Sequence, residues 1–199
     1  SSAGFLVRMD SLGNTTWAVN QGTIGVALTL TELGQLLVYV HGTTFLPACS
    51  SSTGGMGNGW FMLLDPVTAA CSWATNMNPS TSNLRFAKRG SKIYWAGERG
   101  QSSIDIGAGG CTESFGQNEQ VLMVGEIDLG GGCTWLETGI ASNTHNLSPI
   151  VAADDSGNVY VAGSLWIGNL TLGGTTVTTA GSSDVFVARV QPSLGTMQL

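Results

Sequence analysis

The four cysteines are the residues of this 199-residue chain with the most chemistry to offer. Cysteine side chains form disulfides in oxidising compartments, stay as free thiols, or bind metal ions such as zinc. Zinc sites usually contain close pairs such as Cys-x-x-Cys, which are absent here, so no metal site is predicted. What the sequence does contain is a repeated separation of 22 residues, between Cys49 and Cys71 and between Cys111 and Cys133.

A catalytic set is harder to find. The two histidines, His41 and His145, belong to no His-Glu-x-x-His motif, and no Gly-x-Ser-x-Gly motif occurs. The acidic turns at Asp10 and Asp154 lack the further oxygen ligands of an EF-hand loop, so turn formation explains them better. We therefore predict no catalytic residue, no cofactor and no enzymatic activity. Acids from distant segments can still converge for glycoside chemistry, which keeps a polysaccharide hydrolase or lyase as a remote alternative.

The composition disfavours several classes of partner. Only 10% of the residues are charged, against about 25% in typical soluble domains, and the net charge is −6. This sparse, net negative charge disfavours binding to nucleic acid and to anionic membranes, because proteins bind both through cationic side chains. No run approaches the ~18 apolar residues of a membrane-spanning helix, so membrane insertion is not expected. Low charge together with four cysteines favours a secreted or cell-surface location.

The elements that must position these residues form a repeat. Three segments share an opening glycine, a tyrosine among apolar residues and a closing glycine: GQLLVYVHG (34–42), GSKIYWAG (90–97) and GNVYVAG (157–163). A second segment alternates apolar residues up to a turn and then reaches tryptophan, at 4–17, 59–73 and 120–135, with a fourth copy at 184–199 that lacks the tryptophan. A period of about 60 residues built from short strands and tight turns is typical of a β-propeller blade.

We therefore predict an all-β fold, a single β-propeller of four-stranded antiparallel blades with about 3.5 blades in residues 1–199. A half blade at 4–20 precedes three blades at 24–77, 83–138 and 148–199. Closed propellers usually have four to eight blades, so this circle is incomplete. The expected partners are further blades of a longer chain or other copies of this one, because an open array exposes two apolar blade faces.

The last repeat carries a family resemblance. Its stretches IVAADDSGNVYVAGS and DVFVARVQPS resemble the bacterial extracellular propeller repeats of the SBBP type, which build seven-bladed β-propellers. The resemblance covers essentially the whole chain and weakens in the earlier repeats, where WFMLLD and VLMVGEID replace the usual core strand. It implies a secreted propeller and implies no particular activity or ligand.

The recurring aromatic residues are expected to form the core between blades. Alternation along the strands puts each repeated tyrosine on one face of its blade, against the neighbouring sheet. The repeated tryptophans would pack similarly near the rim; a stacking platform for a ligand is the alternative. The residues are Tyr39, Tyr94 and Tyr160, with Trp17, Trp73 and Trp135.

The repeat also suggests how the cysteines pair. In two repeats one cysteine follows the tyrosine strand and another opens the last strand, while the final repeat has threonines near both places. Both positions therefore lack cysteine in the final repeat, as expected if the two cysteines of a repeat form one disulfide. This favours Cys49–Cys71 and Cys111–Cys133 among three possible connectivities. In a simple meander these partners would lie at opposite ends of one strand, so the connection between them has to fold back.

The long connections at 43–58, 98–119 and 164–183 are candidates for binding, because loops on a rigid scaffold often carry it. Their aromatic residues are Phe45, Phe115 and Trp166. The alternative is that IDIG and NLTLGGTTVTT form an extra hairpin on each blade. Sequons for N-glycosylation occur at Asn14, Asn146 and Asn169.

The function predicted from these features is non-enzymatic: a secreted structural, adhesive or self-assembling propeller. The alternative is a glycan-binding, lectin-like module that uses the long connections and their aromatic residues. Surface glycans or proteins would then be partners in addition to other copies of the chain.

Overall fold

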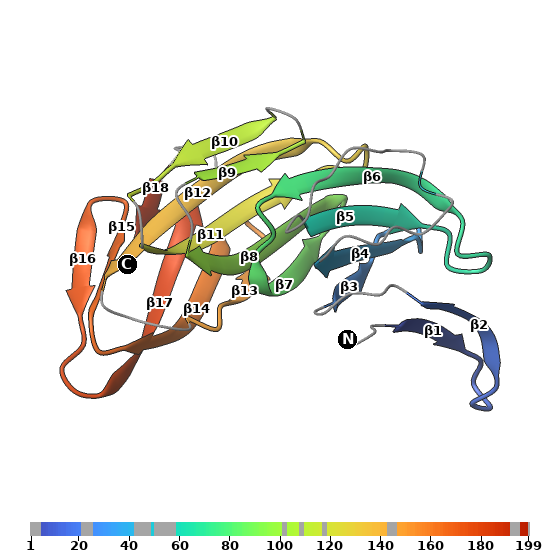
Figure 1. Ribbon diagram of the computed structural model, residues 1–199, viewed down its shortest axis with the longest axis horizontal. Helices are drawn as coiled ribbons and strands as arrows, with labels where there is room; N and C mark the ends of the chain where they lie inside the picture. Colours follow the sequence, from blue (N-terminus) through green and yellow to red (C-terminus); the bar gives the residue numbers. More distant parts are fainter. Residues whose placement is uncertain are drawn as a thin grey trace.

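The computed structural model describes residues 5–20, 26–41, 49, 59–100, 103–107, 110–116, 119–142, 147–191 and 196–198. Within these ranges the chain is all-β, and each strand pairs antiparallel with its neighbours. The predicted fold class is confirmed to this extent. Four sheets follow one another along an open arch, and the described part of the chain does not close into a ring (Figure 1).

The first sheet contains β1 (Phe5–Met9) and β2 (Thr15–Asn20). The second contains, in spatial order, β10 (Cys111–Ser114), β9 (Ser103–Ile106), β6 (Cys71–Asn78), β5 (Gly59–Leu64), β4 (Leu36–His41) and β3 (Val26–Leu30). The third contains β16 (Thr175–Thr178), β15 (Asn169–Leu172), β12 (Cys133–Ser142), β11 (Gln120–Ile127), β8 (Lys92–Gly100) and β7 (Ser82–Arg89). The fourth contains β13 (Ile150–Ala153), β14 (Val159–Trp166), β17 (Ser183–Gln191) and β18 (Thr196–Gln198).

The prediction of four-stranded blades is wrong for the second and third sheets, which have six strands each. The extra strands are hairpins, β9–β10 and β15–β16, that arise in the connections 98–119 and 164–183. Each hairpin folds back and pairs with the last strand of the preceding sheet, β9 with β6 and β15 with β12. The alternative interpretation of these connections, an extra hairpin, is therefore confirmed for both.

One turn geometry recurs where strands reverse direction. The backbone N–H of the fourth residue donates to the carbonyl of the first, and the fourth residue is a glycine with φ between +75° and +88°. Only glycine adopts this left-handed conformation without steric cost, so the repeated glycines of the sequence are needed here. The turns span Asp10–Gly13, Thr31–Gly34, Asp128–Gly131 and Asp154–Gly157.

The hydrophobic core lies between the sheets. One cluster joins the first and second sheets through residues such as Leu6 and Met62. A second joins the second and third sheets around Phe61 and Trp95, and a third joins the third and fourth sheets around Leu122. The inner strand β7 lies beside both β3 and β13, so the sheets stack face to face along the concave side of the arch (Figure 1).

Three of the repeated aromatic residues tie one sheet to the next by hydrogen bonds. The Tyr39 hydroxyl accepts a hydrogen bond from the Thr81 N–H at 2.8 Å and donates to the Thr81 carbonyl at 3.2 Å, across to the third sheet. The indoles of Trp17 and Trp73 donate to Pro66 and Leu129 carbonyls of the following sheet, at 3.0 and 2.8 Å. Neighbouring sheets thus share hydrogen bonds as well as apolar contacts.

The structure contains both disulfides in the pairing that the shared spacing favours, Cys49–Cys71 and Cys111–Cys133. The folded-back hairpin explains how the second pair meets. Cys111 opens β10, which belongs to the second sheet, while Cys133 opens β12 of the third. This disulfide therefore crosses from one sheet to its neighbour.

A closing glycine of the repeated motif is required by close packing. A Cβ atom on Gly163 would lie 2.4 Å from the Leu147 carbonyl oxygen and 2.7 Å from the Phe186 ring. The backbone that leads into β13 thus runs directly against β14 at this position.

We expect Gly163→Ala to lower the free energy of unfolding by about 1–3 kcal/mol, because overpacking forces backbone shifts. The matched control is Gly181→Ala, where a Cβ atom would meet nothing within 4 Å. That change should be neutral or stabilising by up to about 1 kcal/mol through the unfolded chain. Urea unfolding followed by circular dichroism measures both, and equal stabilities of the two variants would contradict the packing argument.

Candidate functional site at the two ends of the arch

Strand register shows which residues of the fourth sheet correspond to residues of the third. In the third sheet Val124 lies opposite Ala96, and Leu122 lies opposite Glu98. In the fourth sheet Val187 lies opposite Ala162, and Val185 lies opposite Ser164. Since Ala96 and Ala162 both follow the repeated tyrosine by two residues, Val187 corresponds to Val124 and Val185 to Leu122.

These equivalent positions differ sharply in exposure. Leu122 and Val124 are 0% exposed because the fourth sheet covers them. Val185 and Val187 are 79% and 60% exposed. Their exposed side of the sheet also holds Ile150, at 60%, and Trp166, at 61%. We call this surface the C-terminal face, made of Ile150, Ala162, Trp166, Val185 and Val187.

The first sheet exposes the complementary side of the repeat. The stretch FLVRM of β1 corresponds to FVARV of β17, so Phe5 matches Phe186 and Met9 matches Val190. Phe186 and Val190 are 4% and 0% exposed, buried against the third sheet, whereas Phe5 and Met9 are 73% and 61% exposed. We call Phe5, Val7 and Met9 the N-terminal face.

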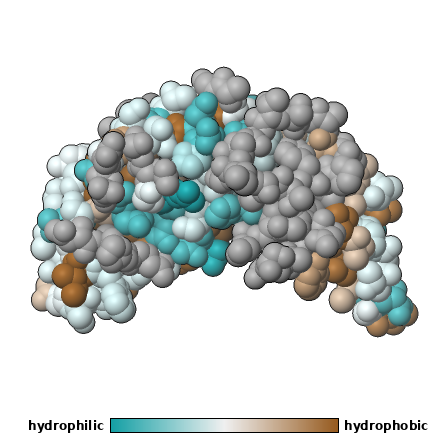
Figure 2. Space-filling view, viewed as in Figure 1, coloured by the Kyte–Doolittle hydropathy of each residue, from teal (hydrophilic) through white to brown (hydrophobic). Residues whose placement is uncertain are grey.

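The two faces lie at opposite ends of the molecule. β1 and β2 form one end of the arch, and the fourth sheet lies toward the other end (Figure 1). Brown, hydrophobic patches are visible at both ends in the space-filling view, a small one on the left and a larger one on the right, while hydrophilic colours gather in the concave middle (Figure 2). The chain therefore presents two separate apolar surfaces that correspond to the two sides of one buried interface.

The repeated tyrosine behaves differently at the exposed end. Tyr39 is buried, which raises the pKa of its hydroxyl, and it bonds across to the next sheet. Tyr160 instead donates at 2.9 Å to Asp154 of its own turn. This bond raises the Tyr160 pKa, and bonds from Asn158, Tyr160 and backbone N–H groups lower the Asp154 pKa to about 2. Tyr160 thus makes a local bond where its counterpart makes an inter-sheet one.

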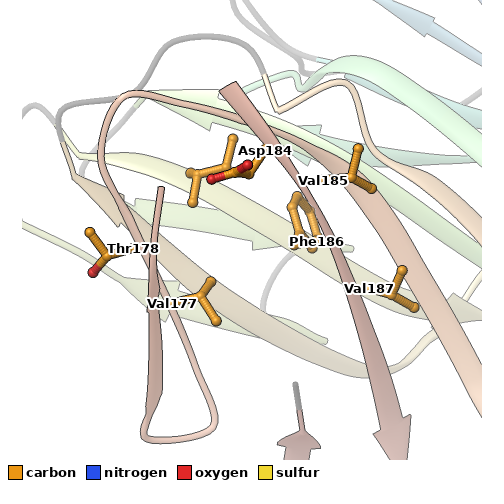
Figure 3. Close-up of a pocket in the computed structure, with 7 residues that line it drawn as sticks. Val177, Thr178, Asp184, Val185, Phe186 and Val187 are labelled. Carbon is orange, nitrogen blue, oxygen red and sulfur yellow. The ribbon is translucent and has the colours of Figure 1, made fainter. Parts of the chain in front are cut away.

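A cavity of about 380 Å³ opens beside β17 (Figure 3). Val177 and Thr178 of β16 lie on one side of it, and residues 184–187 of β17 lie on the other, with Leu165 also lining it. The Asp184 carboxylate accepts a hydrogen bond of 2.6 Å from the Ala180 N–H. Apolar side chains and one carboxylate therefore line a groove between two strands.

The predicted binding residues do not form one site. Trp166 ends β14 and is exposed on the C-terminal face. Phe115 follows β10 and is half-buried against the core between the second and third sheets. Phe45 lies outside the described residues. The glycan-binding hypothesis therefore gains no shared aromatic platform from Trp166 and Phe115.

The predicted glycosylation residues are placed as follows. Asn14 is exposed, and its amide donates to the Asp10 carboxylate at 2.9 Å. Asn169 is half-buried at the start of β15 and pairs in the ladder with Ser142 and Thr178. Asn146 lies outside the described residues.

Several of the described acids take part in turns or in contacts between segments. Hydrogen bonds from the residues that follow them lower the pKa of Asp10 and Asp65, as expected for turn-forming carboxylates. Glu126 is buried, accepts from the Trp135 indole at 3.0 Å and lies 3.4 Å from Lys92 Nζ. Buried Glu98 accepts from backbone N–H groups of Leu147 and Ser148. No three His, Cys, Asp or Glu side chains in the described ranges gather as a metal site requires.

Two disulfides are typical of an oxidising, extracellular environment. In the part of the chain that the structure describes, no helix is long and apolar enough to span a membrane. Comparison with protein-family models gives no match for this sequence, and comparison with curated proteins gives no significant match.

Proposed function

We propose that this chain is a structural, non-enzymatic repeat protein of a secreted or cell-surface location that assembles with copies of itself through its two end faces. One observation carries the proposal. Repeat positions that are fully buried in the third sheet, Leu122 and Val124, correspond to Val185 and Val187, which are 79% and 60% exposed in the fourth. Apolar surface of this kind marks an interaction site, because burying it is favourable.

The architecture that best fits the sheets is part of a β-propeller of the SBBP type. Sheets stacked around adjacent inner strands, with the core between them, support a propeller-like arrangement. In this proposal the first sheet is a half blade, and the hairpins β9–β10 and β15–β16 are additions to the outer strands.

The proposed contact is head-to-tail. In the buried interface between the third and fourth sheets, Phe186 and Val190 pack in one cluster with Tyr94, Leu122 and Val124. Phe5 and Met9 occupy the positions of Phe186 and Val190, so the N-terminal face of one copy suits the C-terminal face of the next. Such a heterologous contact leaves one face free at each end and builds rings or open filaments.

We expect the mass of the chain in solution to rise with concentration, and Val187→Lys to reduce this association at least about tenfold. Burying a valine is worth about 1.5–3 kcal/mol, and 1.4 kcal/mol is a factor of ten in affinity. Val67→Lys is the matched control, because Val67 lies in the turn after β5 and is 61% exposed, against 60% for Val187. Multi-angle light scattering and sedimentation velocity measure the assembly.

The head-to-tail geometry has its own test. Phe5→Lys removes the N-terminal face, and Val187→Lys removes the C-terminal face. Each variant alone should be monomeric, while an equal mixture should form dimers and stop there, since one intact pair of faces remains. A wild-type chain that is monomeric at every soluble concentration, or a mixture that stays monomeric, would overturn the proposal.

A further inference from the structure

The guanidinium of Arg99, near the end of β8, is half-buried and has no acidic partner. All thirteen Asp and Glu residues and all seven Lys and Arg residues of the chain lie in the described ranges. The ion pairs among these side chains are Arg89–Asp155 and Lys92–Glu126, and neither includes Arg99. Partial burial penalises a charge that nothing compensates, so Arg99 lies where an anion would be stabilised.

Strand alternation explains why the adjacent acid does not pair with Arg99. Glu98 lies on the opposite face of β8, where its buried carboxylate accepts hydrogen bonds from the backbone N–H groups of residues 147–148. Arg99 lies on the same face as Trp95, which packs in the core between the second and third sheets. There its Nη1 atom donates to Ser80 Oγ at 3.4 Å. This neutral hydroxyl orients the guanidinium without neutralising its charge.

The imidazole of His41 reaches the same region from the second sheet. His41 follows Tyr39 by two residues in β4, so both side chains lie on the face that packs toward the third sheet. The Tyr39 hydroxyl bonds to the backbone of Thr81, the residue after Ser80. Burial and the nearby Arg99 charge lower the pKa of His41, so its ring is mainly neutral at pH 7 and keeps one N–H donor. Two nitrogen-donor side chains thus approach each other across the interface.

The surroundings of this pair favour an anion. Arg99 lines a small hollow with apolar side chains that include Pro79, Ile104 and Phe115. Apolar surroundings lower the local dielectric constant, which strengthens the attraction between a guanidinium and an anion. Among the described residues, Arg99 is the charged group that acts on the His41 imidazole, and no carboxylate does. Both side chains are half-buried and remain in contact with solvent.

We propose that Arg99 and His41 form a binding site for a carboxylate group. The planar guanidinium fork matches a carboxylate through two parallel N–H bonds, and the His41 N–H supplies another donor. One permanent positive charge suits a monoanion better than a dianion such as sulfate. The carboxylate can belong to a free acid or to an acidic sugar, and the two sources need separate probes. This site does not rest on the assembly proposed above, because it lies between the second and third sheets and uses neither end face.

The test follows the His41 imidazole by NMR in the full 199-residue chain. Replacing chloride with acetate at constant ionic strength should raise the pKa of His41 saturably, because a neighbouring carboxylate favours the imidazolium form. By linkage, acetate should bind more tightly as the pH falls through this pKa. His41→Asn assigns the resonance, since His145 is the other histidine. Glucuronate is the second probe: tighter binding than acetate identifies an acidic sugar as the ligand, equal binding identifies the carboxylate alone, and glucose is the neutral control.

Variants separate a binding role of Arg99 from a structural one. Arg99→Gln should weaken acetate binding at least about tenfold, because charged hydrogen bonds are lost. The same variant should raise the pKa of His41 without acetate, which shows that the site is still folded. Arg189→Gln removes a half-buried guanidinium from the fourth sheet and should leave acetate binding unchanged.

Val187→Lys should bind acetate like the wild type, so failure of the assembly and failure of this site are distinguishable. A wild-type His41 pKa that acetate does not change overturns the proposal. Equal weakening by Arg99→Gln and Arg189→Gln also overturns it, because the effect would then reflect net charge and not a site.

Discussion

Replacing Phe61 with alanine is expected to lower the free energy of unfolding by about 3–5 kcal/mol, in the range of other buried phenylalanine truncations. Phe61 is 0% exposed in β5. Its ring centroid lies 5.1 Å from that of Tyr39, 5.7 Å from that of Trp95 and 6.1 Å from that of Phe86. Since Phe86 and Trp95 belong to the third sheet, the truncation opens a cavity at the interface between two sheets.

The chain offers a matched control for this truncation. Phe5→Ala makes the same chemical change at a side chain that is 73% exposed, so it should alter stability by no more than about 0.5 kcal/mol. Urea unfolding at low protein concentration, where association does not contribute, measures both variants. If Phe61→Ala cost less than 1 kcal/mol, packing between sheets would not be the main source of stability. Phe5→Ala should instead weaken assembly, which light scattering detects.

Much of the fold could be predicted from the sequence because each repeat contains the residue patterns that its strands and turns require. Alternation of apolar residues and the glycine turns at Gly13, Gly34 and Gly157 indicate short antiparallel strands, and the structure has them. Joint loss of both cysteine positions in one repeat indicated the disulfide partners. Each of these signals lies within a single repeat, where separation along the sequence is short.

The remaining features of the fold depend on which strand edges pair and which sheet faces pack together. Residue patterns within one strand or turn do not determine these long-range contacts. Polar and apolar residues alternate in β9 as in any half-buried strand. Nothing in its sequence indicates that it pairs with β6 of the preceding sheet. Phe115 looks like a loop aromatic in sequence, yet the folded-back hairpin brings it half-buried against the core.

The end faces illustrate the same limit most clearly. Val185 and Val187 occupy the same positions of the repeat as Leu122 and Val124. The sequence alone therefore predicts the same burial for both pairs. They differ only because a sheet covers one pair and no described sheet covers the other. The candidate site is therefore a consequence of position within the array, and residue type alone could not identify it.

The disulfide Cys111–Cys133 is expected to be worth about 3 kcal/mol, because it closes a loop of 22 residues in the unfolded chain. Removing it with the double variant Cys111→Ser/Cys133→Ser should lower the free energy of unfolding by about that amount. It should also loosen the attachment of the hairpin β9–β10 to the third sheet, because this disulfide joins β10 of the second sheet to β12 of the third. Hydrogen exchange of residues 103–114 should therefore quicken in this variant.

The double variant Cys49→Ser/Cys71→Ser separates these two consequences. Its disulfide has the same sequence separation, 22 residues, so loop closure predicts a similar loss of about 3 kcal/mol. Exchange in residues 103–114 should be unaffected, because neither cysteine contributes to that hairpin. Urea unfolding gives the stability of both variants, and mass spectrometry of hydrogen exchange gives the local effect. Unchanged exchange in the Cys111/Cys133 variant would mean that strand pairing with β6 alone holds the hairpin, and that the disulfide acts only through the unfolded chain.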